Sequence, residues 1–149
     1  MNVPWQIVIA SADLEDRRTM VNIFAKQGLD PIVASSVAEC QQSMAQENVG
    51  LIFCARSLAD GNYRGLLLAA RASKRRTRIV LTARITDWDE YLEAMRLGAF
   101  DVISAPGRPT DVEWVILQAL RNEHARTRRI TFAQQAASAL PQGEVCKSA

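Results

Sequence analysis

Short apolar runs alternate along this chain with longer segments in which apolar residues recur every three or four positions. The runs are rich in Ile, Val and Leu and mostly do not alternate with polar residues, which is typical of strands covered on both faces. The five runs are QIVIA (6–10), PIVAS (31–35), LIFCA (51–55), RIVLT (78–82) and DVIS (101–104). The pattern therefore predicts a strand and a helix repeated five times.

Polar residues that start helices, and glycines that end them, mark the segments between the runs. Gly28 and Gly98 follow helical stripes and are placed to end their helices. Side chains that accept hydrogen bonds from the first turn of a helix are expected at each start. The predicted start signals are Asp13 with Asp16, Ser36 with Glu39, Asn62, Thr86 with Asp89, and Thr110 with Glu113.

Parallel strands joined by right-handed helical crossovers form a sheet with helices on both faces. We expect a three-layer α/β/α sandwich of the flavodoxin-like type, with five parallel strands in the order 2-1-3-4-5. This domain is predicted over residues 5–122. Residues 123–149 are predicted to be a C-terminal helical extension followed by a loose tail.

Composition limits the possible function classes. The chain has 149 residues, 48% hydrophobic and 23% charged, with a net charge of +2, as in an ordinary soluble domain. No apolar run reaches the roughly 18 residues of a membrane helix, and no signal peptide is present, so we expect a cytoplasmic protein. The basic run SKRRTR (73–78) has no recognition motif beside it, which argues against a nucleic-acid partner.

The residue types that bind metals and cofactors are sparse. Three cysteines are too scattered for a disulfide framework or a zinc site, and His124 is the only histidine. No glycine-rich phosphate loop is present. We therefore expect no metal and no cofactor.

Two motifs give the chain a resemblance to a known family. RIVLTARITDWDEYLEAMRLGAFDVISAP (78–106) is similar to a strand ending V-L-T-A, a helix ending A-x-x-x-G-A and a strand ending T-K-P. GLIFCARSLADG (50–61) is similar to D-L-V-L-L-D-x-x-L-P-D-G. Together they resemble the receiver domain of bacterial response regulators, with the CheY-like fold, over about residues 6–120.

The resemblance implies a site for aspartyl phosphorylation at the carboxyl ends of the strands. Such a site needs an acid pair for Mg²⁺, an aspartate nucleophile, a hydroxyl for a phosphoryl oxygen and a lysine before a proline. In this sequence the acid pair falls on Ser11 and Ala12, the nucleophile on Ala55, the hydroxyl on Thr82 and the lysine on Ala105, before Pro106. The resemblance also implies a cis peptide bond between Ala105 and Pro106.

Shifting the alignment does not restore the missing acids. No residue from 48 to 59 is acidic, and Asp60 matches the turn beyond the strand. Asp13 lies one residue late for the metal pair and is interpreted as a helix cap. Thr82 is explained more simply by a local hydrogen bond than by function. The resemblance therefore indicates a pseudo-receiver that lacks the phosphoacceptor aspartate.

The fourth and fifth helices carry large apolar residues that the helical stripes place outside the core. The inward stripes are Leu92, Met95 and Ala99 in one helix and Val112, Ile116, Ala119 and Leu120 in the other. The residues predicted to form an interaction face are Trp88, Tyr91, Trp114 and Val115. A protein partner or a homodimer is expected there, although packing under a loop or the extension is an equal alternative.

The leading hypothesis is a non-enzymatic signalling module of the receiver family that acts by protein–protein interaction, independently of phosphorylation. One alternative is an atypical response regulator that is still switched by phosphorylation. Another is a small-ligand sensor on a flavodoxin-like scaffold, with its ligand beside Ser11, Ala55 and Thr82.

Overall fold

The computed structural model describes residues 2–73, 76–84, 88–104 and 108–139, with side chains of the last helix described to residue 124 and over 133–136. Five parallel strands form one sheet in the order β2-β1-β3-β6-β7. Their bounds are β1 (Gln6–Ala10), β2 (Ile32–Ala34), β3 (Val49–Ala55), β6 (Arg78–Thr82) and β7 (Asp101–Ile103). The predicted sheet and its strand order are confirmed.

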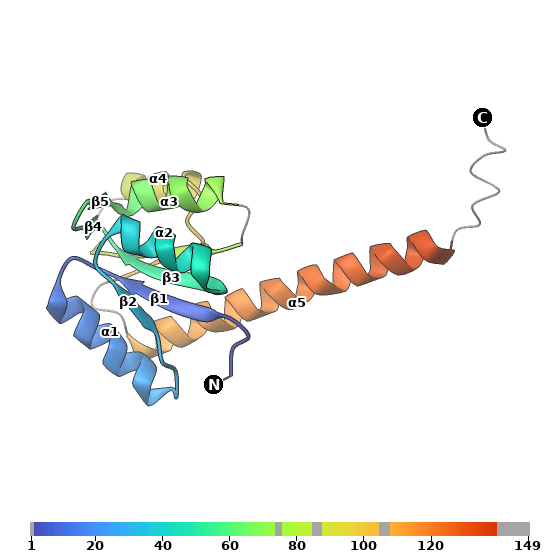
Figure 1. The fold of residues 1–149 in the computed structure, drawn as a ribbon, viewed down its shortest axis with the longest axis horizontal. Coiled ribbons are helices and arrows are strands. Elements are labelled where there is room, and N and C mark those ends of the chain that lie inside the picture. Colours follow the sequence, from blue (N-terminus) through green and yellow to red (C-terminus); the bar gives the residue numbers. More distant parts are fainter. Residues whose placement is uncertain (1, 74–75, 85–87, 105–107, 140–149) are drawn as a thin grey trace. The chain divides into compact units, whose positions relative to one another are not determined.

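Helices cover both faces of this sheet, which makes the three predicted layers (Figure 1). Their bounds are α1 (Leu14–Lys26), α2 (Val37–Gln46), α3 (Tyr63–Ala72), α4 (Trp88–Arg96) and α5 (Pro109–Ala139). The helices α2, α3 and α4 lie over one face, and α1 lies over the other. The first turn of α5 is held near α1, because the side-chain amide of Gln27 donates to the carbonyl of Pro109 at 3.3 Å.

Side chains predicted to start helices occupy those places. Asp13 accepts from the backbone N–H of Glu15 at the start of α1, and Ser36 accepts from that of Glu39 in α2. Asn62 accepts from the N–H groups of the two residues after Tyr63 and begins α3. Thr86, predicted to start the fourth helix, lies outside the described residues.

Two helices end at glycines, as the sequence predicted. Gly28 and Gly98 have φ of 74° and 105°, a conformation that glycine adopts without steric cost. After α4 the N–H of Ala99 donates to Ala94 and that of Gly98 to Met95, which is the Schellman arrangement. Each glycine therefore turns the chain back towards the next strand.

Two local predictions were wrong or incomplete. The last helix begins at Pro109, so Thr110 lies inside it and does not cap it. Proline is favoured in a first helical turn because its missing N–H would have no partner there. The segment after β3 is not a simple turn: β4 (Ser57–Leu58) and β5 (Gly61–Asn62) form a small antiparallel pair.

The core lies on both sides of β3, whose first six residues are all buried. Side chains of a strand alternate between faces, so Phe53 and Ile52 pack on opposite sides of the sheet. Phe53 meets Phe24 of α1 edge to face, with 5.2 Å between ring centroids. Ile52 belongs to the cluster that packs under α2 and α3, together with Leu66. This double burial explains the unbroken apolar run.

The chain forms two compact units, Met1–Val115 and Ile116–Ala149, which divide within α5. The helix extends to Ala139, through most of the segment for which a helical extension was expected. The predicted domain boundary between residues 122 and 123 stays a prediction. Among the described helices, none has both the length and the apolar composition needed to cross a bilayer.

Candidate functional site

The structure brings three of the predicted pocket positions to one edge of the sheet. Ala10 pairs with Cys54 across β1 and β3, and Ala55 pairs with Thr82 across β3 and β6. Ser11, which follows Ala10, therefore lies beside Ala55 at the carboxyl ends of the strands. This is where ligands bind in sheets of this topology. Ala105 and Pro106, with the bond predicted to be cis, lie outside the described residues.

The polar groups of Ser11, at the first of these positions, are engaged in local hydrogen bonds. Ser11 is buried, and its hydroxyl oxygen accepts from the N–H of Asp13 at 3.1 Å. Its carbonyl accepts from the Arg17 guanidinium at 2.6 Å. The Asp13 carboxylate in turn accepts from the N–H of Glu15 at 3.0 Å. Asp13 is therefore a helix cap, as interpreted from the sequence, and Ala12 beside it is exposed.

The nucleophile position is a partly exposed alanine followed by an arginine. Ala55 ends β3 and offers no group that could attack phosphorus. The next side chain, Arg56, donates to the carbonyl of Arg84 at 2.9 Å and pairs with Glu90 of α4 at 2.8 Å. The guanidinium group of Arg56, which contacts both Arg84 and Glu90, thus follows directly after Ala55 in the sequence.

Asp60 is the first acid after β3 in the sequence, and the structure assigns it another role. Its two carboxylate oxygens accept from the backbone N–H groups of Val37 at 2.6 Å and Ala38 at 3.1 Å, at the start of α2. The bond from Val37, together with that from Ala38, holds the pKa of the Asp60 carboxyl below its ordinary value of 3.8. Asp60 is therefore a second cap for α2.

The acid positions at this edge do not suit Mg²⁺, the ion that the receiver fold implies. Mg²⁺ prefers carboxylate oxygens in octahedral geometry. Ser11 and Ala12 carry none, and Asp13 is engaged at a helix terminus. Across the described residues, no group of three His, Cys, Asp or Glu side chains could hold a metal ion.

Thr82 and the buried thiols add no reactive group. Thr82 is half-buried at the end of β6, and no hydrogen bond of its hydroxyl is found within the described part of the chain. Burial raises the pKa of the Cys40 thiol to about 12 and that of Cys54 further still. Both thiols are therefore protonated at neutral pH and act as small core residues.

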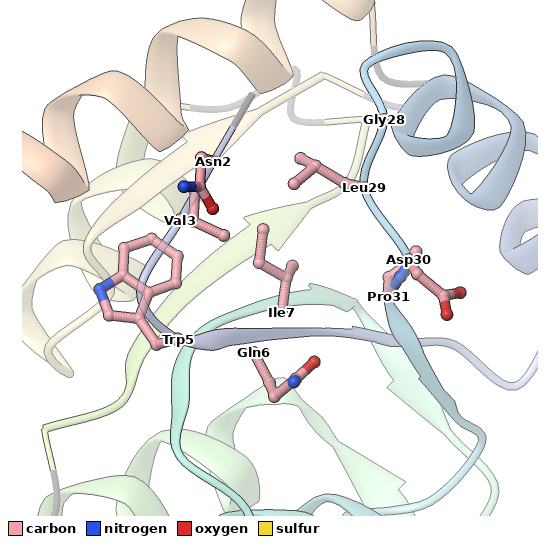
Figure 2. A pocket seen from close by; sticks show the side chains of 9 residues that line it. All are labelled: Asn2, Val3, Trp5, Gln6, Ile7, Gly28, Leu29, Asp30 and Pro31. Atoms are coloured by element: carbon pink, nitrogen blue, oxygen red, sulfur yellow. The ribbon is translucent and has the colours of Figure 1, made fainter.

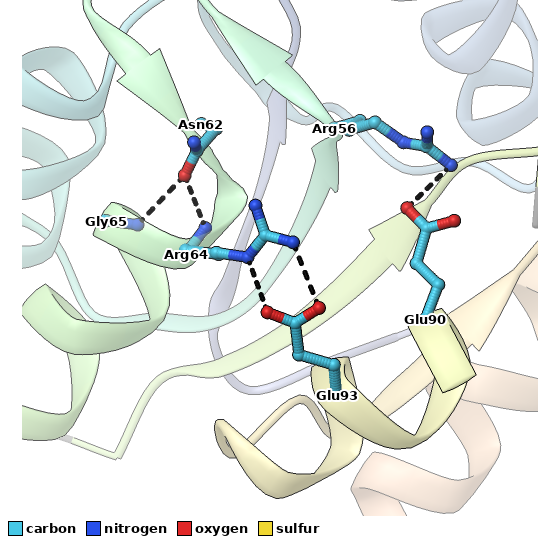
Figure 3. Close-up of polar contacts among 6 residues, drawn as sticks. All are labelled: Arg56, Asn62, Arg64, Gly65, Glu90 and Glu93. Carbon is cyan, nitrogen blue, oxygen red and sulfur yellow. Dashed lines mark hydrogen bonds and ion pairs between the residues drawn. The ribbon is translucent and has the colours of Figure 1, made fainter.

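Sequence patterns gave no sign of the polar contacts that hold α4. Besides the Arg56–Glu90 pair, Arg64 of α3 makes a bidentate pair with Glu93, at 2.9 and 3.0 Å (Figure 3). Arg64 lies in the first turn of α3, where its backbone N–H donates to the side-chain oxygen of Asn62. The partners lie far apart in sequence, so only the fold shows that these charges meet.

The residues predicted to form an interaction face differ in exposure, and the face itself stays a prediction. Trp88 and Trp114 are exposed, at 68% and 56%. Tyr91 is half-buried and stacks on Trp88, with 5.0 Å between ring centroids. Val115 is fully buried, which contradicts its predicted place outside the core.

The error at Val115 comes from the width of the buried stripe of α5. Val112, Ile116 and Ala119 are fully buried as predicted, whereas Leu120 is only half-buried. Val115 is three positions after Val112 and four before Ala119, so it lies on the same side of the helix. The buried face thus extends to Val115 and less far towards Leu120 than the sequence pattern indicated.

A pocket of about 230 Å³ lies at the opposite, amino edge of the sheet (Figure 2). It is lined by Asn2, Val3, Trp5, Gln6, Ile7, Gly28, Leu29, Asp30 and Pro31. The indole of Trp5 packs directly over Gly50, where any side chain would collide with the ring. The lining contains a single carboxylate and no convergent set of charged groups, so it indicates no specific ligand chemistry.

Known proteins resemble this chain in both sequence and structure. No family model matches the sequence. The aerobic respiration control protein ArcA of Escherichia coli (strain K12) is 31% identical over 108 residues, which are 71% of this chain and 44% of ArcA. The chain therefore spans less than half the length of the curated relatives it matches.

Among solved structures, a two-component response regulator from Clostridium difficile superposes with a TM-score of 0.69 at 19% identity, over 78% of this chain and 96% of that one. A CheY-like receiver domain protein from Methanospirillum hungatei JF-1 gives 0.71 at 18%, over 82% and 98%. These likenesses define a CheY-like flavodoxin fold. With the match to ArcA, a response regulator is the class of protein that this chain resembles.

Proposed function

We propose that this chain is a non-enzymatic signalling module of two-component systems that works without phosphorylation and acts by binding protein. The observation that carries the proposal is the state of the carboxyl edge. Ala55 stands where aspartyl phosphorylation needs an aspartate, and the first acids after β1 and β3, Asp13 and Asp60, are engaged as helix caps. A receiver without its acids keeps the scaffold and loses the phosphoryl chemistry.

The exposed aromatic residues support a role in binding protein. Trp88 and Trp114 are among the most exposed large apolar side chains of the described residues, and tryptophan is a common anchor of interfaces. Trp88 is further ordered by its stack on Tyr91. A protein partner or a second copy of the chain, bound through α4 and the start of α5, would remove these rings from water.

Incubation with Mg²⁺ and acetyl phosphate tests the chemical part of the proposal. We expect no phosphoryl mass on the intact protein, whereas a receiver domain that keeps its aspartate gains one. The Ala55→Asp variant should also stay unmodified, because Ser11 and Ala12 cannot hold the metal ion. A phosphoryl group mapped to Asp13 or Asp60 in the parent chain would establish the phosphorylated alternative instead.

Substitution of the exposed rings tests the binding part. Trp88→Glu and Trp114→Glu should leave the circular dichroism spectrum unchanged and weaken association measured by light scattering over a range of concentrations. Leu68→Glu is the matched control, since Leu68 of α3 is 57% exposed and lies outside the proposed face. Equal association by all three variants and the parent would exclude a homodimer through this face.

A further inference from the structure

The helix α4 buries little apolar surface against the rest of the domain. The only fully buried residue of this helix is Ala94, whereas α3 buries Tyr63, Leu66 and Leu67. Burial stabilises roughly in proportion to the apolar area removed from water, and an alanine side chain offers one methyl group. Met95 of α4 is only partly buried against the core, so apolar packing holds α4 less firmly than it holds α3.

Two ion pairs supply a second attachment, and both approach α4 from the side of β3 and α3 (Figure 3). Arg56 pairs with Glu90 at 2.8 Å, and Arg64 pairs with Glu93 through two parallel bonds. The bidentate form fixes orientation as well as distance. Arg56 also donates to the carbonyl of Arg84, which ties the end of β6 into the same set of contacts.

The ion pairs and the exposed aromatic residues occupy different sides of α4. Successive helical residues are rotated by about 100°, so Glu90 lies roughly opposite Trp88. Trp88 is 68% exposed, whereas the Glu90 side chain is only 22% exposed. A rotation of α4 that breaks the ion pairs would therefore also turn the Trp88 ring.

We propose that the Arg56–Glu90 and Arg64–Glu93 pairs, together called the arginine clamp, position α4 and so set the orientation of the Trp88–Tyr91 stack. The four charged residues are positioning residues for this surface. The role of the Trp88–Tyr91 stack in binding a partner rests on the proposed function. The positioning of α4 by the ion pairs does not. In this chain a fixed set of charges holds the helix without any phosphoryl group.

The expected size of the effect follows from the exposure of the pairs. The Arg64 and Glu93 side chains are 46% and 47% exposed, so water and salt screen their attraction. Single exposed pairs contribute modestly, and two linked pairs with one bidentate contact should together shift a local equilibrium by about 5- to 30-fold. A shift of that size is large enough to be measured as a change in the local opening of α4.

Hydrogen exchange read by mass spectrometry on peptides from α4 and α3 tests the clamp. Arg64→Gln and Glu93→Gln should each raise the opening of α4 several-fold, and the double variant should add little to either. The charge swap, Arg64→Glu with Glu93→Arg, should restore most of the protection. Arg71→Gln, a neutralisation on the exposed side of the same α3, should leave α4 unchanged.

Raising the salt concentration should open α4 in the parent chain and have less effect in Glu93→Gln. The proposal is overturned if Glu93→Gln and Arg71→Gln give the same α4 exchange, or if α3 opens as much as α4. The proposed function fails separately, through phosphorylation of the parent chain or through unchanged binding by Trp88→Glu. Neither of those results bears on the hydrogen exchange of α4, so the two proposals can fail independently.

Discussion

The neighbouring helices α3 and α4 cover the same face of the sheet and are attached to it by different forces. Three large or medium apolar side chains of α3 are buried, and Leu66 has no exposed surface. For α4 the buried anchor is Ala94, and two glutamates pair with arginines from outside the helix. The contacts of α3 are mainly apolar, whereas α4 combines a smaller apolar contact, which includes the partly buried Met95, with ion pairs.

The difference predicts different responses to the same conditions. Burial of apolar area is insensitive to pH and is not screened by salt, whereas exposed ion pairs depend on both. In this domain, the helix that the two ion pairs contact, α4, is also the one that carries the exposed Trp88. The element proposed to bind a partner is thus the one whose position the solvent can adjust.

The largest expected effect is on α3. Leu66→Ala should lower the free energy of unfolding by about 2–5 kcal/mol, because it removes buried methyl groups and leaves a cavity. Denaturant unfolding followed by circular dichroism gives the value. Leu68→Ala, at a 57% exposed position of the same helix, should change it by less than about 0.5 kcal/mol. Similar losses for the two variants would show that α3 is not anchored as described.

Ala94→Val tests the tight contact under α4. Ala94 has no exposed surface, so two added carbons must displace a neighbour, at a cost of about 1–3 kcal/mol. The opening of α4 in hydrogen exchange should rise with it. Ala72→Val, at an exposed position of α3, reports the helix-propensity contribution alone and should cost clearly less. Equal costs would contradict a close-packed Ala94.

Acidification should release α4 before α3. The hydrogen bonds from Arg64 hold the pKa of the Glu93 carboxyl below its ordinary value of 4.5. A lowered pKa means that the stabilisation is complete above the ordinary value and is lost as the pH falls through the lowered one. We therefore expect the amide hydrogen-exchange rate of α4, relative to that of α3 and corrected for intrinsic rates, to rise below about pH 4.5. The same ratio in Glu93→Gln should stay nearly flat.

The smallest expected effect concerns the Tyr63 hydroxyl. This group is buried and has no hydrogen-bond partner within the described residues, so it contributes a desolvation cost without a compensating bond. Tyr63→Phe keeps the ring, on which Arg64 lies at 5.1 Å, and should leave the free energy of unfolding unchanged or slightly higher. A loss above about 1 kcal/mol would reveal a partner for the hydroxyl.

The fold was predictable from the sequence because its signals are local. The strand β3 appears as an unbroken apolar run, and the caps Asp13, Ser36 and Asn62 act within a few residues of their own positions. The same holds for the missing chemistry. Ala55 ends an apolar strand whose sequence aligns with the receiver motif, and no shift of a few residues places an acid at its end.

Other features depended on contacts between distant segments, and only the tertiary structure decided them. Asp60 caps a helix that begins 23 residues earlier, and Arg64 meets a glutamate 29 residues later. Val115 is buried although the pattern of α5 placed it outside the core. A side chain's periodicity reports which side of its own helix it occupies. Whether that side meets the core, another charge or water is decided by how the elements pack, because burial and ion pairing are properties of two surfaces together.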